Sequence, residues 1–161
     1  MPYIKQPPHH HKPNKDSKEP NHEFCKRCGL ILHRGRWQKN EALVKEQKKK
    51  RQLTVVLCSA CRKEKEGIVE GVLTIDRAIF ESGAKEIQNE IKNIAKLEFN
   101  RDPLKRITGI NLTKDKIIVN TLTKELAVTI GKHLKKSRKG KLEIHYSPHE
   151  DFAEAFLTAN K

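Results

Sequence analysis

The residues best suited to chemistry in this chain are four cysteines, which form two pairs with the same spacing. Cys25 and Cys28 lie in "CKRCG", and Cys58 and Cys61 lie in "CSAC", with 29 residues between the pairs. A single CxxC is compatible with a redox dithiol, half of a metal site or a coincidence. Two pairs together match the four ligands of a tetrahedral zinc ion, with adjacent thiolates from each pair. Gly29 follows the first pair, where a metal-binding knuckle favours a residue that tolerates positive φ.

We therefore predict one structural Zn²⁺, bound by Cys25, Cys28, Cys58 and Cys61. A four-cysteine site leaves no open position for water or substrate, so the metal would stabilise the fold without catalysing a reaction. Iron or an iron–sulfur cluster, and redox-active or free thiols, remain alternatives. His22 and His33 lie near the first pair and are alternative ligands, whereas the histidine run at 9–11 is expected to be solvated tail.

A basic and aromatic stretch, "HRGRWQK" (His33 to Lys39), follows the first cysteine pair. Arg34, Arg36 and Lys39 surround Trp37, the only tryptophan, and we expect them to contact nucleic acid. Trp37 either stacks on a base, as aromatic side chains of RNA-binding modules do, or covers the cysteines as an apolar plug. A second basic run is a candidate phosphate clamp or an ordinary solvated segment, and it consists of Lys48, Lys49, Lys50 and Arg51.

The charge of the chain points to an anionic partner. The 161 residues contain 34 Lys+Arg and 20 Asp+Glu, a formal net charge of +14. Residues 1–66 carry 17 basic and 7 acidic residues (17 − 7 = +10), and residues 67–161 carry 17 and 13 (17 − 13 = +4). Such an imbalance favours binding to polyanions, and the N-terminal part carries most of it.

Motif and hydropathy patterns exclude several other classes of protein. The sequence has no phosphate-binding loop, no HExxH and no GxSxG, so we expect no enzyme activity and no small-molecule substrate. No apolar run approaches the roughly 18 residues of a membrane helix, and the N-terminus has no apolar core typical of a signal peptide. We therefore expect no membrane association and a cytoplasmic location, where cysteines stay reduced.

Composition divides the chain into three segments. Residues 1–22 are rich in proline, histidine and charge, which predicts a disordered basic tail. Residues 23–66 hold both cysteine pairs but few apolar side chains, which predicts a small zinc-ribbon-like module that depends on its metal. Residues 67–161 have the apolar periodicity of an α+β domain.

The elements expected in the third segment follow from periodicity and turn residues. Strands are predicted at 68–75, 105–112, 116–122 and 141–147, and helices at 78–99 and 124–137, the second ended by Gly140. Residues 151–159 are compatible with either a strand or a short helix. The order β-α-β-β-α-β predicts a ferredoxin-like domain, an antiparallel sheet with two helices on one face.

Several of these motifs resemble those of a known family. The paired CxxC motifs, the "GRW" stretch and "CSACRKEKEGIVEGVLTIDRAIF" resemble the N-terminal part of the eukaryotic and archaeal adaptor family that binds the large ribosomal subunit and escorts its nuclear export. A group of short bacterial proteins of similar length is more similar still, over residues 24–147. The matching positions are Cys25, Cys28, Gly29, His33, Gly35, Arg36, Trp37, Cys58, Cys61, Gly71 to Ile75, Pro103 to Ile107, Leu126, Ala127, Ile130, Gly131, Leu134, Gly140, Leu142, His145 and Tyr146.

The resemblance implies bound zinc, a basic surface that faces RNA, and association with ribosomes. The adaptor family carries more CxxC pairs than this chain, so export itself is not implied. From residues and resemblance together we expect a non-enzymatic, zinc-stabilised RNA-binding protein, associated with ribosomes or ribosomal RNA. The alternatives are a DNA-associated or transcriptional adaptor, a redox or metal-handling protein, and a protein–protein adaptor. A helix-turn-helix or zipper would favour DNA, and neither pattern is recognisable.

Overall fold

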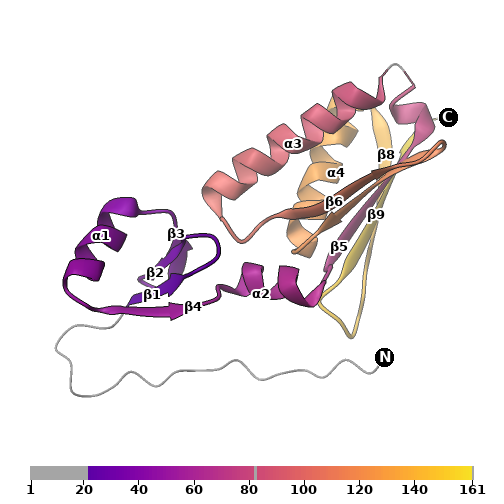
Figure 1. The fold of residues 1–161 in the computed structure, drawn as a ribbon. Coiled ribbons are helices and arrows are strands. Elements are labelled where there is room, and N and C mark those ends of the chain that lie inside the picture. Colours follow the sequence, from indigo (N-terminus) through magenta and orange to yellow (C-terminus); the bar gives the residue numbers. More distant parts are fainter. Residues whose placement is uncertain (1–21, 82, 161) are drawn as a thin grey trace.

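The structure is a computed structural model that describes residues 22–81 and 83–160. It contains two β-sheets with their helices, and a short helix connects the two sheets (Figure 1). The connecting helix is α2 (Ser59–Glu66). Most of the expected tail, including the histidine run at 9–11, lies outside the described residues. His22 is already the first residue of a strand, one residue earlier than the predicted boundary. Among the helices described, none is long and apolar enough to cross a membrane.

The first sheet has four strands in the order β3-β2-β1-β4. Its strands are β1 (His22–Cys25), β2 (Ile31–His33), β3 (Arg36–Gln38) and β4 (Leu53–Val56). Helix α1 (Glu41–Lys49) joins β3 to β4, and its N-cap is Asn40, whose side chain accepts a hydrogen bond from the Leu43 N–H at 3.0 Å. This N-cap satisfies a donor that the first turn of a helix leaves open. The return through α1 lets β4 pair parallel to β1.

Two tight turns of the first sheet require left-handed backbone. Gly29 has φ +76 in the turn between β1 and β2, as the sequence predicts. Arg34 (φ +51) and Gly35 (φ +76) form the two-residue turn between β2 and β3, where His33 pairs with Arg36. Positive φ at both central residues is the geometry of a type I′ hairpin, which favours Asn-Gly over Arg-Gly. Arg34 therefore lies at the tip of a tight turn, in a backbone conformation that arginine does not favour.

The second sheet has five strands in the order β6-β7-β5-β9-β8. Its strands are β5 (Gly71–Asp76), β6 (Ile107–Leu112), β7 (Lys116–Thr121), β8 (Gly140–Tyr146) and β9 (Ala153–Ala159). A 3₁₀ turn, η1 (Arg77–Ile79), follows β5, and the helices are α3 (Ala84–Arg101) and α4 (Lys124–Arg138). Helix α4 packs on β5, β8 and β9, and α3 packs on α4 and β6, so both helices cover one face (Figure 1).

The predicted α+β class is confirmed, but the sheet differs from the antiparallel sheet that was expected. The ambiguous segment 151–159 forms strand β9, which lies between β5 and β8. It pairs antiparallel to β8 and parallel to β5, which makes the sheet mixed. Ala153, Ala155 and Leu157 are buried while Glu154 and Phe156 between them are more exposed, and a strand explains this because its period of two places alternate residues on the same face.

Three predicted boundaries also shift. Strand β5 begins at Gly71, where a side chain would collide with Thr121 and Ala127, three residues later than expected. Helix α3 begins at Ala84, because the 3₁₀ turn η1 precedes it. Helix α4 ends through Lys139, which has φ +53, and Gly140 is instead the first residue of β8. A Cβ atom at Gly140 would lie 2.8 Å from the Thr158 carbonyl, so close packing explains this glycine.

Two apolar cores stabilise the fold. The larger core lies between the second sheet and its helices, and includes Leu73, Ile91 and Ile130. The smaller core surrounds the cysteines. It includes Leu122, and Leu104 packs against it; both leucines belong to the second part of the chain. Because these two leucines follow β7 and α3, the first sheet packs against the second part around the cysteines.

Candidate metal centre and adjoining basic groove

The structure brings the four predicted cysteines into one cluster. The Sγ atoms of Cys25, Cys28, Cys58 and Cys61 all lie within 4.8 Å of one another. The Cys28 and Cys58 sulfurs are 3.6 Å apart. Four thiolates around a tetrahedral ion with bonds of about 2.3 Å would be roughly 3.8 Å apart, so the donor set fits a single metal ion. The described cysteines form no disulfide.

The first cysteine pair lies in a backbone knuckle after β1. The Cys25 N–H donates to the Leu30 carbonyl at 2.8 Å, and the Gly29 N–H donates to the Cys25 carbonyl at 2.9 Å. Burial alone would raise the pKa of Cys25, but hydrogen bonds from the backbone of Cys58, Cys28 and Arg27 outweigh it and lower the pKa to about 6. The knuckle thus favours a thiolate at Cys25, which is the ligand form that metals bind.

The second pair lies at a helix N-terminus, whereas the first pair lies at the end of β1 and in the turn after it. Cys58 is the N-cap of α2, and its Sγ accepts from the Cys61 N–H at 3.4 Å. The N-terminus of a helix stabilises negative charge through its unpaired N–H groups. Burial nevertheless raises the pKa of Cys58 to about 12. Such a buried thiol becomes a thiolate when a cation compensates its charge.

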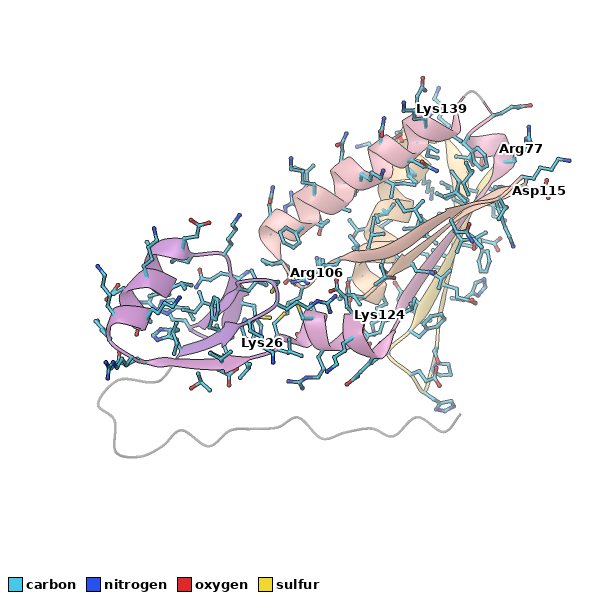
Figure 2. All side chains as sticks on the ribbon, in the orientation of Figure 1. Lys26, Arg77, Arg106, Asp115, Lys124 and Lys139 are labelled. Carbon is cyan, nitrogen blue, oxygen red and sulfur yellow. The ribbon has the colours of Figure 1, made fainter. Side chains whose placement is uncertain are left out.

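Arg106 supplies a cation beside these sulfurs from the second part of the chain (Figure 2). Its Nη1 lies 3.5 Å from the Cys61 Sγ, and its Nη2 lies 4.0 Å from the Cys58 Sγ. Its side chain is only 13% exposed, and the same Nη1 forms an ion pair with Glu64 at 3.5 Å. Burial lowers the pKa of Arg106, but hydrogen bonds to Cys61 and Cys28 outweigh burial and raise it. Four thiolates around a divalent ion carry two excess negative charges, and Arg106 compensates one of them.

Sequence reasoning did not single out Arg106 as a site residue. It lies 45 residues beyond Cys61, and no local spacing marks it as a partner of the cysteines. Its backbone segment reaches the cluster because Asp102 ends α3 and the turn from Pro103 leads into β6, with the Arg106 Nε donating to the Pro103 carbonyl at 2.9 Å. The histidines proposed as alternative ligands are elsewhere engaged: His22 Nε2 and His33 Nδ1 lie 3.0 Å apart, and their rings stack.

A groove adjoins the metal cluster between the first sheet and the end of α3. It has a volume of about 580 Å³. One wall is the β2–β3 hairpin, and the other is the C-terminal turn of α3 with the loop that follows it. The lining residues are His33, Arg34, Arg36, Trp37, Gln38, Lys39, Phe99, Asn100, Arg101 and Pro103. We refer to this hollow as the basic groove.

The lining of the basic groove carries four permanent cations and no carboxylate. Arg34, Arg36 and Lys39 are exposed, and in the described part of the chain no ion pair or side-chain hydrogen bond engages them. Arg101 is bound to Glu98 at 3.1 Å, so its charge is partly compensated. Three of these four cations were predicted from the sequence. Their charge is available to an anion that enters from outside.

The position of Trp37 is compatible with both roles that the sequence left open. It is half-buried, packs against the core around the cysteines, and also lines the basic groove. Phe99 and Asn100 of the opposite wall were missed by sequence reasoning, which assigned Phe99 only to the end of a helix. No local pattern in the sequence marks Phe99 as a site residue; in the structure it is 36% exposed at the end of α3.

The second predicted basic run lies apart from this groove. Lys48 and Lys49 are exposed in the last turn of α1, and Arg51 is exposed at φ +55 in the turn before β4. Lys50 forms an ion pair with Glu46 at 2.8 Å. None of the four is part of the groove lining. Their contact with nucleic acid stays a prediction that involves a different surface.

Comparison of the chain with known protein families, with curated proteins and with solved structures gave no match.

Proposed function

We propose that this protein is a non-enzymatic, zinc-stabilised RNA-binding protein of the cytoplasm that acts on ribosomes or ribosomal RNA. The observation that carries the proposal is the basic groove, which combines four cations and two aromatic side chains with no carboxylate in its lining. Nucleic acids present phosphates to cations and base faces to aromatic rings, so this lining is complementary to them. The ribosomal target is inferred from the family resemblance of the motifs.

Zinc is the ion that fits the cluster best. Four sulfur donors in a closed arrangement are typical of structural zinc sites, and the soft thiolate set disfavours magnesium or calcium. Three of the cysteines are buried, and Arg106 compensates part of the negative charge that four thiolates would bring. With zinc bound, these residues would fix the knuckle, the start of α2 and the Arg106 loop relative to one another.

The core around the cysteines explains why a metal would be needed. Besides the cysteines, its buried apolar members among the described residues are Leu30, Ala60 and Leu122, and the first sheet adds the buried Ile31. So small a core cannot offset the entropy of ordering the first sheet, whereas a structural zinc contributes roughly 10–16 kcal/mol apparent in peptide systems. Since the β2–β3 hairpin is one wall of the basic groove, the metal would also maintain the RNA-binding surface.

Sedimentation tests the proposal directly. Tagged full-length protein in lysate should move with ribosomal particles through a sucrose gradient at low salt and return to the top at high salt, because phosphate contacts release counterions. Nucleic acid recovered with the native protein should be destroyed by RNase and resist DNase. DNA in its place would favour the DNA-associated alternative. Absence of both nucleic acids, together with no sedimentation at any salt, would refute the proposal.

A further inference from the structure

We propose that the basic groove takes unpaired nucleotides of single-stranded RNA, with bases against Trp37 and Phe99 and phosphates on the surrounding cations. This inference rests on the proposed RNA binding and adds the class of RNA. It also assigns Phe99, Asn100 and Arg101, from the second part of the chain, to the binding surface. The site is therefore composite, with one wall from each sheet-bearing part of the molecule.

The size of the groove fits nucleotides and not a duplex. A volume of about 580 Å³ lies within the range of roughly 300–1,000 Å³ found for sites that enclose small molecules. In double-stranded RNA the bases are stacked inside the helix, and proteins contact its phosphates and 2′-hydroxyls across a broad shallow groove. The aromatic walls of the groove could not stack on the bases of a duplex, because those bases are not accessible, whereas unpaired bases expose both of their faces.

The aromatic side chains are held in place before any ligand binds. Trp37 belongs to strand β3 and packs against the core around the cysteines. Phe99 is 36% exposed on α3, and the Arg106 guanidinium lies over its ring at 5.9 Å from the centroid. Because Arg106 is itself bound to Glu64 and to the Pro103 carbonyl, it restricts the ring. Rigid aromatic anchors lose little conformational entropy on binding, which favours base stacking.

The polar side chains divide into two kinds. Arg34, Arg36 and Lys39 have no partner in the described residues and can contact phosphates. Gln38 and Asn100 add an amide from each wall, and amides can hydrogen-bond to the edges of unpaired bases. Arg34 stands at positive φ in the β2–β3 turn, where asparagine would be more stable. Its presence there adds a cation to the groove at a conformational cost.

The test compares a single strand with a duplex. The zinc-loaded full chain is titrated with a 12-nucleotide RNA of mixed sequence, alone and annealed to its complement, at the same salt concentration. Anisotropy of a dye on the RNA gives the affinity. Fluorescence of Trp37 reports on the groove without a label, because the chain contains one tryptophan. We expect the single strand to bind at least about 10-fold more tightly than the duplex and to quench Trp37, as base stacking predicts.

Phe99→Leu supplies the decisive variant. It keeps an apolar side chain at an exposed position, so the fold should be retained, but it removes the π-face. We expect the single strand to bind on the order of 10-fold more weakly, as loss of one stacked base implies, with duplex binding unchanged. Leu97→Ala is the matched control, because Leu97 is 61% exposed on the same helix and is not part of the groove lining. It should leave both affinities unchanged.

The outcomes separate this inference from the function on which it rests. Preference for the single strand, quenching of Trp37 and weakening by Phe99→Leu together support it. Equal affinity for strand and duplex, with Phe99→Leu indistinguishable from Leu97→Ala, would overturn it while leaving RNA binding intact. Failure to bind either RNA would overturn the proposed function and this inference with it.

Discussion

Replacement of Arg106 by glutamine should weaken metal binding without removing a ligand. Arg106 approaches the Cys61 and Cys58 sulfurs at 3.5 and 4.0 Å, and its side chain is 13% exposed. Arg106→Gln keeps a hydrogen-bond donor of intermediate length but removes the positive charge. The four thiolates would then retain their full excess charge in a largely buried setting, although Arg27, which donates to the Cys61 carbonyl at 3.2 Å, would remain nearby.

The magnitude follows from the distances. Two unit charges 4 Å apart at an effective dielectric constant near 20 attract by about 4 kcal/mol, and desolvation of the guanidinium offsets part of this. Partners in the outer shell of metal sites are typically worth 10–100-fold in metal affinity. We therefore expect the dissociation constant for zinc to rise by about 10–100-fold in Arg106→Gln. Arg106→Lys should fall between the two proteins, because it keeps the charge and loses the forked geometry.

Competition with a chelating dye measures this change. Dissociation constants for zinc are compared between the parent protein, Arg106→Gln, Arg106→Lys and Arg101→Gln. The last variant is a control, because Arg101 is 76% exposed, pairs with Glu98 and does not approach the sulfurs. Circular dichroism of the loaded proteins checks that each remains folded. An unchanged dissociation constant in folded Arg106→Gln would show that the arginine does not compensate the thiolate charge.

Four further predictions follow from individual contacts. Cys58→Ser should abolish tight metal binding and remove hydrogen-exchange protection from the first sheet, while the larger core between the second sheet and its helices keeps its protection. Because serine can also cap the N-terminus of α2, this effect can be assigned to the lost metal ligand. Trp37→Ala should speed zinc loss to a chelator and cost about 2 kcal/mol in thermal unfolding, less than the roughly 3–5 kcal/mol of a fully buried tryptophan. Arg34→Asn should leave the melting temperature unchanged or higher, since asparagine tolerates positive φ better, while RNA binding weakens. A hydrogen bond from Lys105 lowers the pKa of the buried Glu98 below its ordinary 4.5, so its contribution to stability is present above pH 4.5 and is lost as the pH falls through the lowered pKa; Glu98→Gln should flatten this acid limb in pH-dependent unfolding.

Local patterns in the sequence predicted most of the elements of residues 67–161 and the shared site of the four cysteines, but none of the individual strands of the first sheet. The hairpin around residues 113–115 and both helices of the second part have strong periodicity and clear turn residues, and the structure confirms them. The CxxC pairs are informative because both ligands of a pair are close in sequence, so their spacing alone indicates a shared site. Gly29 was assigned a positive φ for the same local reason.

The features that sequence reasoning missed depend on contacts between distant segments. The apolar pattern of β9 is also compatible with a helix, and its position between β5 and β8 depends on pairing with strands from two places in the chain. Arg106 and Phe99 join the site only because the loop after α3 folds against the first sheet. Nothing in their neighbouring residues indicates that packing. Conversely, the basic run that ends at Arg51 lies outside the groove. Its position is set by the end of helix α1, and a run of charges in the sequence does not indicate where that end lies in the fold.

The salt dependence of RNA binding tests the central claim most directly, which is that the basic groove contacts phosphates. Two variants each remove three positive charges and each place asparagine at a position with positive φ. The groove variant is Arg34→Asn/Arg36→Gln/Lys39→Gln, and the control is Lys48→Gln/Lys49→Gln/Arg51→Asn.

Binding of a single-stranded RNA is measured for the zinc-loaded parent and both variants between about 50 and 200 mM salt. Each lost phosphate contact should flatten the slope of log K against log [salt] by about 0.7, so the groove variant should lose about 2 units of slope and the control much less. Equal slopes and affinities for the groove variant and the parent, or equal losses in both variants, would contradict the assignment of RNA binding to the groove.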